Sequence, residues 1–484
     1  MAYFNEEIAK QPISGNPHQH GHLQMTWILR TFAPRKSANT LRKMRKFDYL
    51  FLILSVLSMA LASCSKDEGG EPGTGDVFFE IDPSGVREWT AEELADELYG
   101  AEGSEVSEEN AKLRKQFLEN VALHEAELGN EFGANGVAMG YIGYKYYYQS
   151  PDVNGETRTL SARVVWARYN LFGWHNLDPD NLYIMEHPFI TDNADAPSEC
   201  TSFEMGLSTQ DYLLISPDGL GYGINKEMID PYQNHEVSVK NTMDALEAGY
   251  AVWKKYGSGT MEDDWKTIIL GLSEGAGKAL ALHKYFDTHD DEASKWHFSY
   301  SFTCAGSYDP SRTWETYYDW GKTEYIAVIP MTIKSMLASY PDVLKGYSED
   351  DFYCDKYLAV KSRIDALLAG KNMSYKEQDG KIKELLGTET PTLSDVLSDT
   401  FLDKNSDIYK AFVGCLKKND LSTGWTPKHA IKILASKSDE FIPYASTEAI
   451  RNAFGDMVTV TSIVTCDHSD ICDLYHTAYT SIVW

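Results

Sequence analysis

Residues Lys266-Thr-Ile-Ile-Leu-Gly-Leu-Ser-Glu-Gly-Ala-Gly-Lys-Ala-Leu-Ala-Leu282 decide the fold of this 484-residue chain. The apolar, β-branched run Lys266–Leu270 predicts a strand, and the small-residue run Ala276–Leu282 predicts a helix. Between them, Gly271-Leu-Ser-Glu-Gly275 places Ser273 on a sharp turn with glycine on either side, where a side chain would not fit. A strand, a turn and a helix in this order predict a nucleophilic serine that stands clear of a sheet.

The chain around this segment alternates between strand and helix patterns. An antiparallel hairpin is predicted first, with strands at Gly136–Ser150 and Arg158–Ala167 split by Asn154-Gly155. This order predicts an α/β fold, with a mostly parallel sheet flanked by helices on both faces. The strands predicted after the hairpin are Leu182–Met185, Tyr212–Ser216, Lys266–Leu270, Phe298–Cys304, Ile431–Ser436 and Met457–Val464.

One long helical stretch, about 314–425, does not fit this alternation. A βα unit needs roughly 30 residues, so the segment between Ser273 and the strand at Ile431 holds more than the sheet requires. We expect the surplus to form an inserted helical cap over the strand ends. Its large apolar residues favour packing of the cap over the lining of an acyl or aromatic pocket. The predicted helical blocks are Ile326–Tyr340, Leu358–Ala369, Ile382–Leu386 and Leu393–Leu402.

Two residues after the last strands can activate the serine. A serine hydroxyl reacts well only when a base removes its proton and a carboxylate orients that base. Asp439 follows the strand Ile431–Ser436, and His468 follows the strand Met457–Val464. Because neighbouring parallel strands end at the same edge of a sheet, the sequence predicts Ser273, Asp439 and His468 as a catalytic triad.

Competing residues exist for two of these positions. Asp309 follows the strand Phe298–Cys304 and could supply the carboxylate, whereas His476 lies eight residues past His468. Asp439 is favoured because Asp-x-x-x-Pro comes directly after an apolar strand. Cys466 and Cys472 flank His468, either as a disulfide or as two separate buried thiols. No pair of cysteines has the spacing of metal ligands, so no metal site is predicted.

Negative charge that develops on a substrate oxygen calls for two backbone N–H donors. Glu274, the residue after the serine, is expected to supply one. The loop Glu186-His-Pro-Phe189, after the strand Leu182–Met185, is expected to supply the other. Since Pro188 has no N–H, Phe189 is the predicted second donor.

The N-terminal region has the pattern of an export signal. A basic segment starts at Met44, the short apolar run Leu50–Leu61 follows, and Leu61-Ala-Ser-Cys64 resembles a bacterial lipobox. We expect translation to start at Met44, cleavage before Cys64 and acylation of that cysteine. The predicted divisions are an extension at 1–43, a signal peptide at 44–63, a flexible tether at 64–88 and a domain at 89–484.

The residues after Cys64 bear on where the protein is carried. Ser65-Lys-Asp-Glu68 resembles the signal that sends Bacteroidetes lipoproteins to the cell surface, which implies an outer-membrane lipoprotein exposed there. Residues 1–63 hold 8 Lys and Arg against 3 Asp and Glu, so the remaining 36 basic and 69 acidic residues give a formal charge of −33. This charge excludes nucleic acid as a partner and favours a neutral or cationic small molecule. A need for solubility outside the cell explains this negative charge equally well.

From about Gly136 to Trp484 the sequence resembles an α/β-hydrolase of the secretory-lipase kind. The stretch from Tyr212 to Gly223, with Asp230-Pro-Tyr232, is similar to the strand and loop before the helix of that family's nucleophile turn. The stretch from Asn419 to Pro427 is similar to the segment leading into its acid strand. The resemblance implies an α/β-hydrolase fold and a cofactor-free serine esterase or lipase acting on small-molecule esters.

The sequence departs from that family at two points. His187-Pro188 stands where lipases commonly have His-Gly, and Glu274 places a carboxyl group beside the nucleophile, which we expect to select against anionic substrates. Two other functions remain as alternatives. A serine peptidase like prolyl oligopeptidase shares the triad order, although no N-terminal region of β-propeller length is present. An inactive surface lipoprotein that binds a partner is disfavoured by the intact turn and triad.

Overall fold

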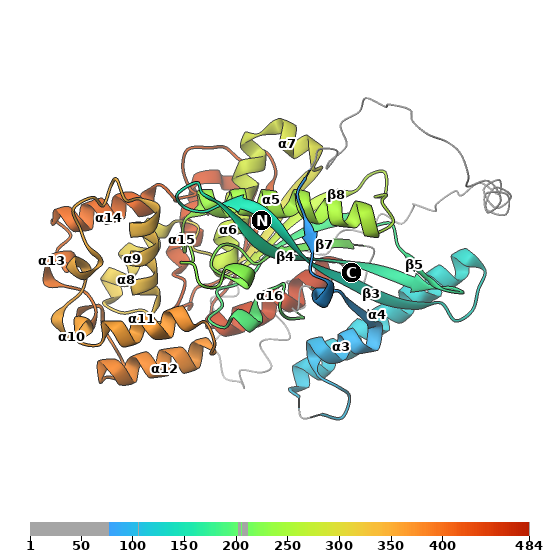
Figure 1. Ribbon diagram of the computed structural model, residues 1–484, viewed down its shortest axis with the longest axis horizontal. Coiled ribbons are helices and arrows are strands. Elements are labelled where there is room, and N and C mark those ends of the chain that lie inside the picture. The colour runs from blue at the N-terminus through green and yellow to red at the C-terminus, as the bar shows by residue number, and fades with distance from the viewer. Residues whose placement is uncertain (1–76, 105, 202–204, 206–211, 484) are drawn as a thin grey trace, which may run out of the picture.

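A computed structural model of the protein describes residues 77–104, 106–201, 205 and 212–483 (Figure 1). The expected signal peptide, Cys64 and the first part of the tether lie outside the described residues. The described residues form a sheet of eleven strands in the order β1-β3-β4-β7-β6-β8-β9-β10-β11, with β2 paired to β3 and β5 to β4.

Six neighbouring strands of the sheet are parallel, and all six agree with the sequence prediction to within two residues. The hairpin β3 (Ala138–Pro151) and β4 (Thr157–Asn170) joins them antiparallel to β7. The predicted α/β fold with a mostly parallel sheet is therefore confirmed. The parallel strands are β6 (Asn181–Glu186), β7 (Tyr212–Pro217), β8 (Lys266–Leu272), β9 (Phe298–Cys304), β10 (Ala430–Ser436) and β11 (Val458–Ile463).

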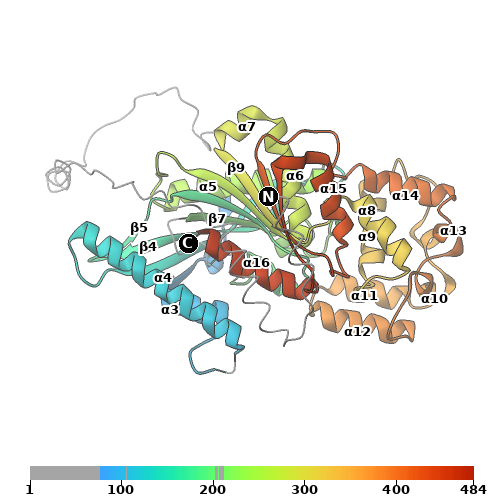
Figure 2. The ribbon, with the colours of Figure 1, turned by 180° about the vertical axis from the view of Figure 1, so that it is seen from behind.

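Helices cover both faces of the sheet, because successive side chains of each strand point to opposite faces. Tyr183 of β6 belongs to the core formed with α3, α4 and α16, whereas Leu182 and Ile184 belong to the core formed with α5 and α6. Figures 1 and 2 show these two layers from opposite sides. The helices are α3 (Ala91–Tyr99), α4 (Glu108–Phe132), α5 (His235–Tyr256), α6 (Glu274–Thr288), α7 (Asp290–Lys295), α15 (Tyr444–Phe454) and α16 (His468–Val483).

The predicted tether is wrong in its last part. Strands β1 (Glu80–Ile81) and β2 (Arg87–Thr90) both pair antiparallel with β3, so the ordered domain begins near residue 80 rather than at 89. Asp82 fixes this segment, since its carboxylate accepts a hydrogen bond from Tyr147 Oη at 2.8 Å. Short edge strands such as β1 and β5 (Trp174–Asn176) carry little pattern of their own and depend on the strand beside them.

A block of helices between β9 and β10 extends from one end of the sheet (Figure 1). It has its own apolar core, in which Phe401 contacts Phe352 and Phe412 with ring centroids 4.7 and 5.2 Å apart. Ile326 and Ile333 belong to this core, so they pack the cap as expected. The helices are α8 (Pro310–Trp320), α9 (Val328–Ser339), α10 (Asp355–Leu358), α11 (Lys361–Gly370), α12 (Tyr375–Leu386), α13 (Asp399–Leu402) and α14 (Asp407–Lys417).

One predicted cap helix does not form as a single helix. Residues 393–402 contain a 3-10 turn at Leu393–Asp395 and then the short helix α13. The break has a local cause, because Ser398 caps α13 by accepting a hydrogen bond from the N–H of Phe401. Apolar spacing alone does not show such an internal cap.

Candidate active site

Ser273 lies on a strained turn between β8 and α6. Its backbone has φ 55° and ψ −118°, which is unusual for a residue with a side chain. A Cβ on Gly271 would lie 2.4 Å from the carbonyl oxygen of Gly275, and a Cβ on Gly275 would lie 2.1 Å from that of Glu186. Both glycines are therefore required sterically. The N–H of Ser273 donates to the carbonyl of Cys304 at 2.8 Å and ties the turn to β9.

The structure brings Ser273, His468 and Asp439 together at the carboxyl ends of the parallel strands. Ser273 Oγ lies 3.0 Å from His468 Nε2, and His468 Nδ1 lies 2.8 Å from Asp439 Oδ2. Asp439 Oδ1 accepts hydrogen bonds from the N–H groups of Phe441 at 2.9 Å and Ile442 at 2.7 Å. These four contacts fix the carboxylate, the imidazole and the hydroxyl in one line.

The imidazole of His468 is held in a charged environment. Burial lowers its pKa, but the Cys472 sulfur and the Asp439 carboxylate raise it by more, so the pKa lies above its ordinary value. Cys472 is one helical turn further along α16. The Asp439 carboxylate stabilises a protonated His468 through its contact with Nδ1 at 2.8 Å.

Asp309, the competing carboxylate, lies at a different place. It caps the N-terminus of α8, where its Oδ1 accepts from the N–H of Arg312 at 2.9 Å and from Ser311 Oγ at 3.0 Å. Its neighbour is the carboxyl group of Asp420, and among the described contacts none joins it to His468. The side chain of His476 is outside the described part of the chain.

The thiols near the site are not joined. Cys466 and Cys472 are both free thiols, so the disulfide expected as one of two possibilities does not form between them. Cys304, Cys466 and Cys472 pack in the same core below the turn.

Glu274 is the first residue of α6, so its N–H has no acceptor within the helix. Its carboxylate, however, does not confront a substrate. It is buried and forms an ion pair with Lys278 at 2.8 Å, one turn along the same helix. The expectation that Glu274 selects against anionic substrates stays a prediction, and the ion pair with Lys278 weakens its physical basis.

The loop after β6 lies against the turn. The carbonyls of Glu186 and His187 are the atoms that approach Gly275 most closely. His187 is buried between two carbonyls, with Nε2 2.8 Å from Asp218 O and Nδ1 2.7 Å from Pro188 O. Burial, aided by Lys278, lowers its pKa to about 4. Phe189 follows Pro188 in the same loop, and its role as the second N–H donor stays a prediction.

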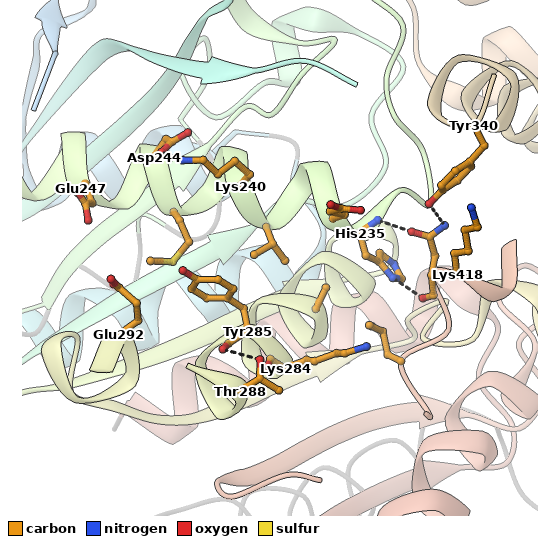
Figure 3. Close-up of a pocket in the computed structure, with 16 residues that line it drawn as sticks. His235, Lys240, Asp244, Glu247, Lys284, Tyr285, Thr288, Glu292, Tyr340 and Lys418 are labelled. Atoms are coloured by element: carbon orange, nitrogen blue, oxygen red, sulfur yellow. Dashed lines mark hydrogen bonds and ion pairs between the residues drawn. The ribbon is translucent and has the colours of Figure 1, made fainter. Parts of the chain in front are cut away.

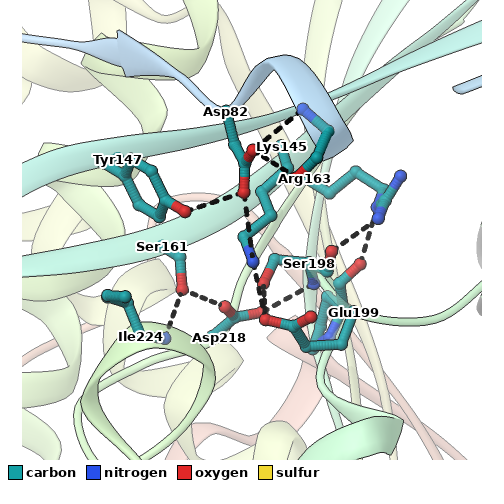
Figure 4. Close-up of polar contacts among 11 residues, drawn as sticks. Asp82, Lys145, Tyr147, Ser161, Arg163, Ser198, Glu199, Asp218 and Ile224 are labelled. Atoms are coloured by element: carbon teal, nitrogen blue, oxygen red, sulfur yellow. Dashed lines mark hydrogen bonds and ion pairs between the residues drawn. The ribbon is translucent and has the colours of Figure 1, made fainter. Parts of the chain in front are cut away.

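Asp218 also fixes a later part of the same connection between β6 and β7, at Ser198 (Figure 4). Its carboxylate accepts from Ser161 Oγ at 2.5 Å and from the N–H of Ser198 at 2.7 Å, and burial raises its pKa to about 6. Arg163 holds the same loop by donating to the carbonyls of Pro197 and Ser198 at 2.8 and 2.5 Å. Buried hydrogen bonds therefore hold the turn at Asp218 in place.

A buried cluster of charges below the turn was not foreseen. Burial raises the pKa of Glu186 to about 7, although Lys278 and a hydrogen bond from Thr242 oppose the rise. Lys278 also faces the buried carboxylate of Asp230. The signal in the sequence was an ionisable residue inside an otherwise small and apolar helix, since Lys278 interrupts the run Ala276–Leu282.

Two cavities in the described part of the chain lie outside this triad. An open groove of about 810 Å³ runs along α5 and the second half of α6, lined by charged residues such as Lys240, Glu247 and Lys284 (Figure 3). A smaller cavity of about 230 Å³ separates the cap from the body beside Phe189. Within the described ranges no group of three or more metal-ligating side chains gathers, and no helix is long and apolar enough to cross a membrane.

The strand order and the position of Ser273 define an α/β-hydrolase fold. The ligand-bound form of the rice cell wall degrading esterase LipA from Xanthomonas oryzae is similar to this chain, with 17% identity, a TM-score of 0.61 and coverage of 84% of this chain and 96% of that one. A protein of Legionella pneumophila is 18% identical over 72% of this chain and 88% of its own, with a TM-score of 0.55. At such identities the likeness shows the fold. No family model and no curated protein matches the sequence.

Proposed function

We propose that the protein is a serine hydrolase that cleaves carboxylic esters through an acyl-enzyme, in the manner of an esterase or lipase. The observation that carries the proposal is the hydrogen-bonded line from Ser273, on its strained turn, through His468 to Asp439. The Xanthomonas oryzae protein of similar fold is an esterase, which is consistent with this assignment.

In the first half of the reaction, Ser273 Oγ attacks the ester carbonyl carbon while His468 Nε2 takes the hydroxyl proton. The carbonyl oxygen becomes negative and is stabilised by the N–H of Glu274 and, as we propose, that of Phe189. When the carbonyl re-forms, the bond to the alcohol oxygen breaks. His468 returns the proton to that oxygen, the alcohol leaves and the acyl group stays on Ser273.

In the second half, water replaces the alcohol. His468 Nε2 removes a proton from water, the hydroxide attacks the acyl carbon, and collapse of the intermediate releases the acid and restores the Ser273 hydroxyl. Asp439 keeps the Nδ1–H tautomer of His468 and stabilises its imidazolium form. Because this carboxylate already accepts two backbone N–H groups, it is oriented before the substrate binds.

The test uses purified mature chain with p-nitrophenyl esters of graded acyl length, alongside prolyl and aminoacyl p-nitroanilides. We expect turnover of esters in the wild type and its loss in Ser273→Ala. Cleavage of the anilides with no ester turnover would favour a peptidase like prolyl oligopeptidase. Absence of all turnover in a folded wild type would favour the inactive binding protein.

We further propose that Cys64 is acylated and anchors the protein to the outer membrane, with the domain at the cell surface. The first strand begins at Glu80, 16 residues after Cys64, so the chain between them spans at most about 58 Å. Cys64→Ala should abolish labelling by a lipid precursor and release the protein from membranes. Membrane association that persists in that variant would mean that the apolar run Leu50–Leu61 is retained as the anchor.

A further inference from the structure

The turn between β4 and β5 places two aromatic side chains in solvent. Phe172 is fully exposed, at 103%, and Trp174 is 40% exposed. The turn is tight, because the N–H of Leu171 donates to the carbonyl of Gly173 at 3.0 Å and Phe172 has φ 59°. A bulky residue rarely adopts a positive φ, so Phe172 is held at the apex at a conformational cost. Residues 171–174 form this aromatic tip.

Trp174 has a fixed position on the hairpin. It pairs with Asn170 across β4 and β5, and a Cβ on Gly140 would lie 2.6 Å from an atom of its ring. The glycine therefore makes room for the indole. The Arg168 guanidinium lies 4.6 Å from the ring centroid of Trp174 and is itself paired with Glu88 at 2.7 Å. The aromatic tip is thus formed before it contacts a partner.

The two chain segments that meet at the aromatic tip carry no charged side chain. Residues 132–144 and 169–177 lack Asp, Glu, Lys and Arg, in a chain of which 24% is charged. The segments meet because Ala138 of β3 pairs with Asn170 of β4. Transfer of charge into lipid is costly, so this uncharged end can approach lipid where the charged surface of an acidic protein cannot.

Two carboxylates border the uncharged end. Burial is the main cause of the raised pKa of Tyr169, and the charges of Glu131 and Asp178 raise it further. The Tyr169 ring stacks on Phe132 at the base of the aromatic tip, with centroids 5.0 Å apart. Carboxylates in this position repel an anionic surface. The surface that fits the aromatic tip is therefore uncharged or zwitterionic.

The shape of the aromatic tip favours a lipid surface over a protein partner. A stable protein interface is a broad face that buries about 800 Å² on each partner, whereas the aromatic tip is one projecting turn. Aromatic rings are enriched where a membrane meets water. Phe172 at the apex, with Trp174 beside it, has the composition and the exposure for that boundary.

The proposed anchor brings the aromatic tip within reach of a membrane. Glu80, in the first strand, pairs with Tyr147 of β3, and the hairpin end lies nine residues away along β3, at Ala138. At about 3.4 Å for each residue, this distance is about 31 Å. The chain between Cys64 and Glu80 spans at most about 58 Å. An acylated Cys64 and Phe172 can therefore lie in the same membrane surface.

The aromatic tip and the triad lie at opposite ends of the sheet. β4 runs antiparallel to β7 with Trp166 beside Leu213, so Asn170 lies beyond the amino end of β7. The triad lies at the carboxyl ends of the parallel strands, where the cap is joined. Figures 1 and 2 show β5 and the cap helices at opposite ends of the molecule. A membrane at the aromatic tip leaves the triad facing the medium.

We propose that the aromatic tip inserts into the uncharged or zwitterionic surface of a phospholipid membrane and orients the anchored protein, with its active site directed away from that membrane. The ester substrate then comes from the medium and not from the lipids of the anchoring membrane. The inference rests on the proposed acylation of Cys64 and adds an orientation to it.

The experiment uses the full-length acylated protein in phosphatidylcholine vesicles. The photocrosslinker p-benzoylphenylalanine replaces Phe172 in one variant and Trp320 in the matched control. Trp320 is an aromatic residue of α8 in the cap and is 42% exposed. After irradiation, mass spectrometry should find at least tenfold more phospholipid adduct at position 172 than at position 320. Circular dichroism shows that both variants are folded.

A charge at the apex tests whether Phe172 itself enters the lipid. With the crosslinker in place of Trp174, Phe172→Asp should lower the lipid adduct at position 174 at least threefold, because a carboxylate resists transfer into lipid. Asp tolerates a positive φ better than Phe does, so the turn is kept. Trp320→Asp is the matched control and should leave the adduct at position 174 unchanged.

The outcomes separate the aromatic tip from the anchor. Lipid adducts that are absent from position 172 or equal at 172 and 320, or an adduct at 174 that survives Phe172→Asp, overturn the insertion and leave the acylation of Cys64 standing. In intact cells, adducts of position 172 with another protein and not with lipid would also overturn it, in favour of a protein partner. Absence of lipid on Cys64 of the wild type overturns the anchor and this inference together.

Discussion

The part of the body that the structure describes contains two hydrogen-bonded sets of serine, histidine and aspartate. In the set away from the nucleophile turn, His283 Nδ1 lies 2.8 Å from Ser301 Oγ and His283 Nε2 lies 3.0 Å from Asp287 Oδ2. These contacts are as short as those around Ser273. The two sets have the same chemical groups at the same distances. Groups and distances alone therefore do not identify which serine is the nucleophile.

Backbone and exposure separate the two sets. Ser301 lies in the middle of β9 with ordinary strand geometry, whereas Ser273 has a positive φ at the end of β8. The His283 side chain is 0% exposed, against 15% for His468. A substrate can reach only the set at the strand ends, where sites form in such sheets.

The buried set has a structural task. Asp287 also accepts from His429 Nδ1 at 2.5 Å and from the N–H of Lys428 at 2.7 Å, which ties α6 to the segment before β10. Although burial opposes it, these bonds and that from His283 lower the pKa of Asp287 to about 2. The comparison teaches that contact distances alone do not mark a nucleophile, whereas backbone strain and exposure distinguish Ser273 from Ser301.

The largest effect should come from the two aspartates. Asp439→Asn should lower kcat by about 10⁴-fold, since the amide favours the wrong tautomer of His468. Asp287→Asn should leave kcat within about twofold, because a change away from the triad that leaves the site intact has little effect on the rate. Steady-state kinetics with a p-nitrophenyl ester measures both.

Asp309→Asn is the control for this pair. It keeps the loop after β9 but touches no triad residue, so kcat should remain near the wild type. A loss at Asp309→Asn larger than that at Asp439→Asn would assign the acid to the earlier strand.

The next effect is on stability. Here the buried set, and not the set around Ser273, should show the larger change. Asp287→Asn should lower the free energy of unfolding by about 3 kcal/mol, because it removes one partner of a buried network. Ser273→Ala should change it by less than about 1 kcal/mol, since a small side chain is lost from the turn. Urea unfolding at pH 7 measures both, and equal stability of Asp287→Asn and the wild type would contradict the structural role.

The pH dependence of unfolding should reveal Asp287 as well. Its pKa is lowered in the folded state, so its contribution to stability is present above the unfolded pKa near 4 and is lost as the pH falls through 4 toward 2. Thermal unfolding of Asp287→Asn should show a shallower decline over that window. A decline as steep as that of the wild type would assign acid sensitivity to other carboxylates.

A smaller effect is expected on the pH dependence of activity. The base must be neutral, and the pKa of His468 is raised, so kcat/KM should fall with decreasing pH along a limb centred above 6.5. Asp439→Asn should move that limb down by about one pH unit. A limb that stays in place in Asp439→Asn would mean that another group sets the pKa of the base.

The smallest effect concerns the pair of carboxyl groups that Asp309 and Asp420 form. Burial and the neighbouring Asp309 raise the pKa of Asp420 to about 7. Its contribution is therefore present below the unfolded pKa and lost as the pH rises through 7. Asp420→Asn should flatten the fall in Tm between pH 5 and 8, and an unchanged slope would contradict the pairing.

The sequence predicted the parallel strands and the placement of Asp439 and His468, because each follows a β-branched run whose end must lie at the sheet edge. It did not predict the strands near Glu80 and Arg87, since their pairing is made by β3. Local pattern also missed contacts between distant segments. The cavity between Asp230 and Lys371 and the burial of Glu274 are of this kind.

The most direct test of the central claim is labelling with a fluorophosphonate, which reacts only with an activated serine. Mass spectrometry of the labelled full-length protein should find the phosphonate on Ser273 and not on Ser301. Ser301→Ala should keep the label and Ser273→Ala should lose it. Labelling that persists in Ser273→Ala, or a phosphonate found on Ser301, would contradict the account.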